Sequence, residues 1–129
     1  MNYSNPQALA EPLGAYSHVA SANGLVSIAG QVGADRDGVV ADGTADQVVQ
    51  AFANVRLALE AEGLEPSDVL QLTTYLITPD DIPVFYEARA KVFAEMFPDG
   101  GYPPNTLLVV SRLVQPELLV EMSALAVRQ

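Results

Sequence analysis

The order of strand-like and helical segments constrains the fold of this chain more than any other feature of its sequence. Runs rich in strand-forming residues are predicted to be strands at 16–22, 25–32, 68–77, 106–113 and 117–127. Apolar residues at helical spacing predict one helix over about 45–62 and a second that begins after Pro79 and ends before Pro98. The order β-β-α-β-α-β-β predicts an α+β sandwich in which two helices cover one face of a mixed sheet.

Short local signals mark where these segments begin and end. Asn23-Gly24, between two strand-like runs, is typical of a tight hairpin turn. Thr44 with Gln47 three residues later fits a capping box at a helix start, and Gly63 fits a left-handed helix end. Residues 1–14 are interrupted by two prolines and are predicted to be irregular.

The composition predicts that the second face of this sheet is also covered. Half of the 129 residues are hydrophobic and only 17% are charged, whereas a soluble monomeric domain normally carries more charge. A length of 129 residues is typical of one domain, so we expect residues 1–129 to form a single unit. The low charge and the uncovered face together predict that copies of the chain bury this face against each other.

The charge balance argues against some classes of partner. The net charge is −10, and the six basic residues are scattered along the chain rather than clustered. Binding to nucleic acid or to an anionic membrane surface requires clustered Lys and Arg, so we expect neither partner. No apolar run approaches the roughly 20 residues that a membrane span requires.

The content of cysteine and histidine limits the chemistry that the chain can perform. There is no cysteine, which rules out disulfides, thiolate metal ligands and a cysteine nucleophile. His18 is the only histidine, so no metal site is predicted. Because the first residues lack the basic and apolar regions of a signal peptide, we expect a cytoplasmic protein.

The segment 102–113 is the strongest candidate for part of a binding site. Two prolines end a loop there, and an apolar run rich in β-branched residues follows at once. This pattern predicts a rigid turn that places Asn105 and Thr106 at the mouth of a buried strand. Polar side chains at the entrance of a strand are well placed to meet a ligand.

Several motifs spread over almost the whole chain resemble those of the RidA/YjgF family of enamine and imine deaminases. They are Gly14-Ala-Tyr-Ser-His18, Ser27-Ile-Ala-Gly-Gln-Val-Gly33, Gln50-Ala-Phe-Ala-Asn54-Val55, Asp68-Val69 with Thr73 and Tyr75, Arg112-Leu113, and the run Val120–Val127. The resemblance implies a chorismate-mutase-like fold. It also implies a homotrimer with three small-molecule sites in the clefts between subunits, and no metal or organic cofactor.

The same resemblance implies roles for individual residues. Glu121 matches a glutamate that positions the attacking water, and Tyr16 matches a tyrosine that lines the site. Gly30 and Gln31 match a Gly-Gln pair whose backbone approaches the ligand. Independently of the resemblance, alternation along the predicted strand 16–22 places His18 on the same face as Tyr16. Strand alternation leaves other interpretations open: Glu121 as a solvent-facing residue, Tyr16 as a half-buried strand tyrosine, and His18 as a structural residue.

Three positions depart from the deaminase pattern. Asn105 stands where those enzymes have an arginine that binds the substrate carboxylate, Ala29 replaces a serine, and Tyr86 replaces an asparagine. An asparagine carries no charge and cannot neutralise a carboxylate, so we expect weak or no activity on 2-aminoacrylate and similar imino acids. Asn105 as a simple turn residue is the alternative interpretation.

Three functions therefore remain open from the sequence. The first is a trimer that binds a small metabolite and hydrolyses an imine or enamine. The second is a non-catalytic module for ligand binding or protein interaction, and the third is a pathway-specific hydrolase acting on a neutral substrate. Members of this family have also been described as ribonucleases, but the acidic charge balance argues against that activity here.

Overall fold

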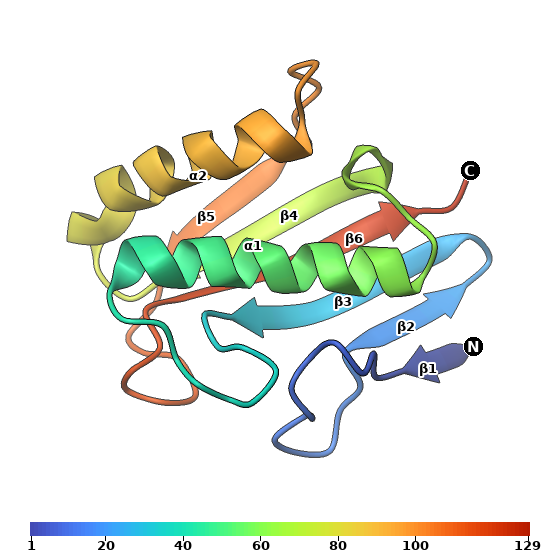
Figure 1. Ribbon diagram of the computed structural model, residues 1–129, viewed down its shortest axis with the longest axis horizontal. Helices are drawn as coiled ribbons and strands as arrows, with labels where there is room; N and C mark the ends of the chain where they lie inside the picture. Colours follow the sequence, from blue (N-terminus) through green and yellow to red (C-terminus); the bar gives the residue numbers. More distant parts are fainter.

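The computed structural model describes residues 1–129 and contains one mixed sheet and two α-helices (Figure 1). The strands are β1 (Asn2–Ser4), β2 (Val19–Ala22), β3 (Leu25–Val32), β4 (Val69–Leu76), β5 (Asn105–Val109) and β6 (Val120–Val127). The helices are α1 (Thr44–Ala61) and α2 (Ile82–Met96), and short 3₁₀ turns, η1 (Pro66–Asp68) and η2 (Pro79–Asp81), precede β4 and α2.

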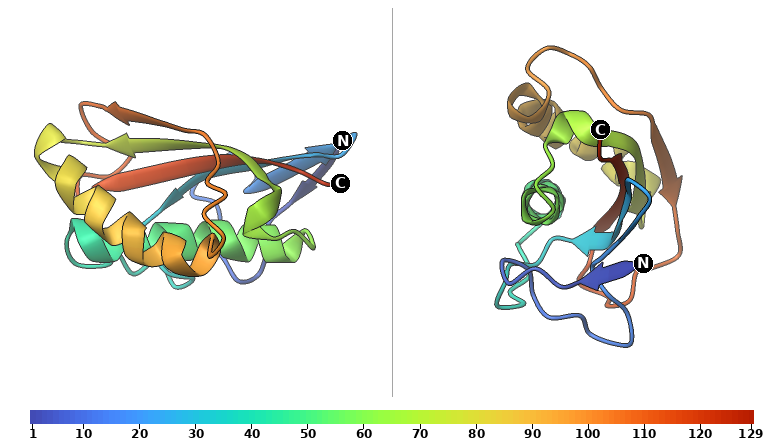
Figure 2. Two further views of the ribbon diagram at one scale, coloured as in Figure 1. Left: turned by 90° about the horizontal axis from the view of Figure 1, so that it is seen from above. Right: turned by 90° about the vertical axis from the view of Figure 1, so that its right-hand side faces the viewer.

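The sheet has the order β1-β2-β3-β6-β4-β5. All neighbouring strands are antiparallel except β4 and β5, which are parallel and are joined through α2. Both helices lie on the same face of the sheet, and the other face is open in the single chain (Figure 2). The predicted α+β arrangement, with two helices on one face of a mixed sheet, is confirmed.

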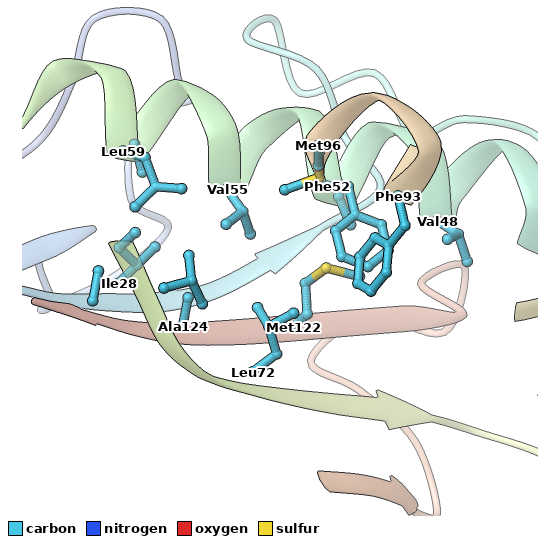
Figure 3. Packing of buried hydrophobic residues seen from close by; sticks show 14 of the residues in the cluster. Ile28, Val48, Phe52, Val55, Leu59, Leu72, Phe93, Met96, Met122 and Ala124 are labelled. Carbon is cyan, nitrogen blue, oxygen red and sulfur yellow. The ribbon is translucent and has the colours of Figure 1, made fainter. Parts of the chain in front are cut away.

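The core lies between the helices and the covered face of the sheet. Alternate residues of β6 are buried there, and Phe52 on α1 and Phe93 on α2 meet edge to face with ring centroids 5.3 Å apart. Figure 3 shows Met122 of β6 close to these two rings. All the buried apolar side chains except Leu118 form a single cluster of 23 residues, which is the main source of stability for this fold.

The two ends of α1 bear out one sequence prediction and overturn another. Gly63 has a φ of 70° and Leu64 donates its N–H to the carbonyl of Leu59 at 2.9 Å, as expected for a left-handed helix end. The predicted capping box is wrong, because Gly43 precedes the helix and no side chain caps it. Thr44 instead donates its hydroxyl to Asp81 at 2.8 Å.

The strand boundaries also differ from the sequence predictions. Asn2–Ser4 forms the edge strand β1, although residues 1–14 were expected to be irregular. The predicted first strand begins at Val19 rather than at 16, so Tyr16 and His18 lie in the loop before it. The predicted last strand begins at Val120 rather than at 117.

β5 is shorter and more exposed than predicted. It ends at Val109 because its only neighbour, β4, ends at Leu76, and the chain then turns away. The Arg112 guanidinium holds this turn by donating to the carbonyls of Leu113 and Val114, each at 3.0 Å. β5 lies at the sheet edge with half-exposed side chains, so the expectation of a buried strand is wrong for the single chain.

The open face of the sheet carries almost no charge. Alternation along β3, β4, β5 and β6 places these side chains on it: Leu25, Ser27, Thr73, Tyr75, Thr106, Leu108, Glu121, Ser123, Leu125 and Val127. Glu121 is the only ionisable carboxylate among them. Neither helix is long and apolar enough to span a membrane.

Candidate functional site

A cleft of about 500 Å³ opens at the end of β3, beside the start of β6. Its walls come from the N-terminal loop (residues 10–18), the second half of β3, the loop at 34–40 and the segment 114–121. These segments meet because β3 and β6 are paired, which brings the end of one strand against the start of the other. It is a concave, partly apolar space of the size that small-molecule sites normally have.

Gly30 and Glu121 form the floor of this cleft. The register of β3 against β6 shifts between Ile28 and Gln31, which places Gly30 in an irregular stretch opposite the start of β6. A Cβ atom added to Gly30 would lie 2.5 Å from Oε2 of Glu121 and 2.6 Å from its Cδ. Glycine is therefore required for the Glu121 carboxylate to lie against the backbone of β3.

The Glu121 carboxylate is available for chemistry. It is half-buried and has no hydrogen bond or ion pair with any other group of the chain. Burial raises the pKa of this carboxyl above its ordinary value, because desolvation disfavours the charged form. Its side chain points to the open face of the sheet, as strand alternation predicted, but that position lies inside the cleft rather than in bulk solvent.

His18 and Gln31 connect the N-terminal loop to β3. The Gln31 amide nitrogen donates to Nδ1 of His18 at 3.1 Å and to the carbonyl of Ala29 at 3.0 Å. With Nδ1 accepting, Nε2 of His18 carries the proton and donates to the carbonyl of Ala10 at 2.7 Å. Both ring nitrogens are therefore used inside the protein, which supports the structural interpretation of His18, although its ring lines the cleft.

The mouth of the cleft is apolar. Tyr16 is half-exposed, and its ring meets the His18 ring edge to face with centroids 5.8 Å apart. Leu13 and Val114, which also line the cleft, are 79% and 72% exposed. Large apolar side chains this exposed and this close together are typical of a surface that a ligand or another chain covers.

Two buried amides on α1 support the cleft and were not identified as functional from the sequence. Asn54 lines the cleft and donates to the carbonyls of Val32 at 3.0 Å and Ala34 at 2.8 Å. Gln47 donates to the carbonyl of Glu117 at 3.0 Å and accepts from the N–H of Leu119, which fixes the segment before β6. Asn54 lies in one of the family motifs and Gln47 was interpreted as a capping residue, but neither signal indicated a role in supporting a cleft.

Three predicted site residues lie outside this cleft. Asn105 is on β5, where its Oδ1 accepts from the hydroxyl of the buried Thr74 at 2.9 Å, so its amide N–H groups remain free. Thr106 is exposed on the open face of the same strand. Tyr86 is half-exposed on α2, with the Arg89 guanidinium carbon 4.8 Å from its ring centre.

The structure therefore groups the predicted residues in two sets. One chain brings together Tyr16, His18, Gly30, Gln31 and Glu121. Asn105, Thr106 and Tyr86 would meet that set only through another subunit. No group of three potential metal ligands occurs anywhere in the chain.

Comparison with known proteins was made on both sequence and structure. The family model described as endoribonuclease L-PSP matches residues 6–128. A RutC family protein of Pyrococcus horikoshii is 32% identical over 92% of this chain and 91% of its own. The 2-iminobutanoate/2-iminopropanoate deaminase of Salmonella typhimurium is 26% identical over 91% of this chain and 90% of its own.

The fold agrees with this result. The crystal structure of Escherichia coli TdcF with bound serine superposes with a TM-score of 0.92 over 100% of both chains, at 23% identity. The predicted chorismate-mutase-like fold is thereby confirmed. The match of the family model over nearly the whole chain, together with these relatives, shows that the chain belongs to the RidA/YjgF family.

Proposed function

We propose that this protein is a homotrimer that hydrolyses small imines or enamines in clefts between its subunits. The observation that carries the proposal is the half-buried, unpartnered Glu121 carboxylate in a partly apolar cleft. The deaminase of Salmonella typhimurium, a relative over 91% of this chain, supports the reaction class.

Glu121 is the residue we assign to catalysis. A carboxylate whose pKa is raised by burial is a better general base near neutral pH than an exposed one. It would accept a proton from a water that attacks the imine carbon, and later return the proton to the leaving nitrogen. Gly30 lets the carboxylate lie beside the backbone of β3, while Gln31 and His18 hold the surrounding loop.

The trimer is proposed because it would cover the uncharged open face and complete the site. A neighbouring subunit packed on that face would bring its β5 toward the cleft, and the free amide of Asn105 could then donate to the ligand. Such a donor has no charge. We therefore propose that imino acids such as 2-aminoacrylate are poor substrates, because nothing at this position pairs with their carboxylate.

The test is an imine-hydrolysis assay on the purified protein. An amino-acid oxidase or a dehydratase generates the imine, and semicarbazide traps what has not been hydrolysed. Glu121→Gln should abolish hydrolysis while Glu60→Gln, which removes one negative charge from the exposed surface of α1, should not. Equal activity of the wild type and Glu121→Gln would refute the assignment of Glu121.

A second candidate function is ligand binding without turnover. The lack of a charged group at Asn105 favours it, because the family's imino-acid substrates lose their main anchor here. Binding of a ligand in the cleft with no hydrolysis of any imine would establish this alternative and refute the enzymatic proposal.

A further inference from the structure

The charged groups of the cleft have one sign. Its lining includes the carboxylates of Glu11 and Glu121 but no arginine and no lysine. Glu11 is exposed at the opening, where the cleft adjoins a second, polar groove, and Glu121 lies on the floor. The rest of the wall is largely apolar, with Leu13, Tyr16 and Val114 at the mouth.

The basic residues of the chain are placed elsewhere. Arg128 and Arg56 pair with Glu62 at 3.2 Å and with Glu95 at 3.7 Å. The guanidinium of Arg112 is held by two carbonyls of its own turn, and that of Arg89 lies over three aromatic rings of α2. Of the remaining two, Arg36 lies in the groove beside the cleft, and Lys91 lines a groove between α1 and α2.

The open sheet face, through which copies would meet, carries no basic side chain. A neighbouring copy that brings Tyr86 to the cleft also brings Arg89, whose guanidinium is held over three aromatic rings of α2. Each chain also has sixteen acidic residues against six basic ones, so the field of the whole molecule attracts cations toward the cleft. In one chain, an anion bound in the cleft would face two carboxylates and no basic side chain of the cleft wall.

We propose that the cleft selects a cationic ligand, namely a protonated imine or amine with an apolar body and no carboxylate. Glu121 pairs with the positive nitrogen, the mouth residues contact the apolar body, and Glu11 acts as a specificity-determining residue that repels anions at the opening. The hydrolytic step rests on the function proposed above. It consumes one water and no redox partner: R–CH=NH₂⁺ + H₂O gives R–CHO + NH₄⁺.

The atoms and electrons of this step balance within the cleft. Glu121 takes a proton from water as the oxygen bonds to the imine carbon, and the C=N π electrons move to nitrogen. The protonated carboxyl then gives that proton to the amine nitrogen, the C–N bond breaks, and ammonia takes the remaining hydroxyl proton as the carbonyl forms. An uncharged alkyl or aryl group suffices for R.

Two imines that differ only in a carboxylate test this selection. A flavin amine oxidase converts benzylamine to phenylmethanimine, and an amino-acid oxidase converts phenylglycine to its 2-imino acid. Ammonia release, followed by glutamate dehydrogenase, is compared with and without the protein. We expect at least a tenfold preference for the imine without the carboxylate, and an equal or opposite preference would overturn the proposal.

Binding of the matched pair benzylammonium and benzoate separates this inference from catalysis. Calorimetry should show binding of benzylammonium but not of benzoate. An interaction with an exposed charge changes affinity by about 1.5- to 5-fold, so Glu11→Gln should lower the affinity for benzylammonium by that factor. Glu121→Gln should lower the affinity for benzylammonium by about tenfold or more, because a charged hydrogen bond in a half-buried position is lost. Glu60→Gln is the control for net charge.

The outcomes are distinguishable. Cation-selective binding without hydrolysis of either imine would support the selection and refute the proposed enzymatic function. Hydrolysis with a preference for the carboxylated imine would support the function and overturn the selection. Absence of binding by either probe, or tighter binding of benzoate, would also overturn it.

Discussion

Replacing Gly30 by alanine tests whether the position of the Glu121 carboxylate matters, without altering Glu121 itself. The new Cβ would lie 2.5 Å from Oε2 and 2.9 Å from Cγ of Glu121. Carbon atoms and their non-bonded neighbours settle at about 3.5 Å, so the carboxylate must move by about 1 Å. It is the end of a flexible side chain and can move without disturbing the sheet.

The expected result is therefore a loss of activity without a loss of fold. A displacement of about 1 Å in a catalytic group can reduce the rate by roughly 10²-fold. The backbone of Gly30 does not need a positive φ, so alanine is tolerated there and the free energy of unfolding should change by less than about 1 kcal/mol. The assays are ammonia release from the imine and thermal unfolding at one protein concentration.

Gly33→Ala is the matched control. Its Cβ would lie 2.6 Å from Cα of Gln47, which belongs to the backbone of α1 and cannot move alone. Such overpacking costs about 1–3 kcal/mol, which lowers the melting temperature by roughly 3–10 °C in a chain of this size. This variant should lose stability, whereas Gly30→Ala should lose rate.

A double-variant comparison decides whether Gly30 acts through Glu121. If it does, Gly30→Ala weakens benzylammonium binding in the wild type but causes little further weakening in Glu121→Gln, because the carboxylate that it displaces is absent there. Wild-type activity in Gly30→Ala, or equal further losses in both backgrounds, would refute the reasoning.

Three further outcomes are expected. Glu121→Gln should increase the free energy of unfolding at pH 8 but not below about pH 4. Burial raises the pKa of this carboxyl, so its ionised form lowers the stability of the fold above that raised pKa, whereas the protonated form does not. Urea unfolding at the two pH values checks this, and an equal gain in stability at both would contradict it. Ser123→Glu places a charge on the open sheet face and should convert a trimer to monomers, which light scattering would detect. A wild type that is monomeric at micromolar concentration would refute the trimer and the shared site. Asn105→Arg should strengthen binding of pyruvate or 2-oxobutanoate by about 10- to 100-fold through a new charged hydrogen bond. It should not restore full turnover, because Ala29 and Tyr86 remain. Unchanged affinity in calorimetry would show that Asn105 does not face the ligand.

The sequence predicted those parts of the fold that depend on local signals. Asn23 and Gly24 have φ values of 52° and 82°, as the hairpin between β2 and β3 requires. The helix end at Gly63 was equally clear, because its left-handed conformation is specified by one residue. The hydroxyl of Thr78 accepts from the N–H of Asp80 at 3.2 Å and so caps η2, the turn at Pro79 that leads into α2.

The parts that failed depend on distant contacts. Gln47 was interpreted as a capping residue, but its amide donates a hydrogen bond to the carbonyl of Glu117, which lies some seventy residues further along the chain. The length of β5 could not be read from its own apolar residues, because it is set by the end of β4. β1 is only three residues long and exists because β2 offers an edge with which it can pair.

The site was predicted in part. The resemblance identified Tyr16, Gly30 and Glu121, which one chain brings together, whereas alternation alone placed Glu121 in solvent. Alternation gave the direction of that side chain correctly, but a single strand contains no information about the loop that encloses it. Whether Asn105 belongs to the same site depends on a second chain, which no local pattern describes.

The central place of β6 has a consequence for how the chain folds. β6 is the strand that comes latest in the sequence, yet it lies between β3 and β4 and pairs with both along most of its length. Until residues 120–127 leave the ribosome, the hairpin of β2 and β3 and the parallel pair of β4 and β5 have no common neighbour. Formation of the complete sheet must therefore wait until β6 has been synthesised, and it closes loops of high sequence separation, which slows folding.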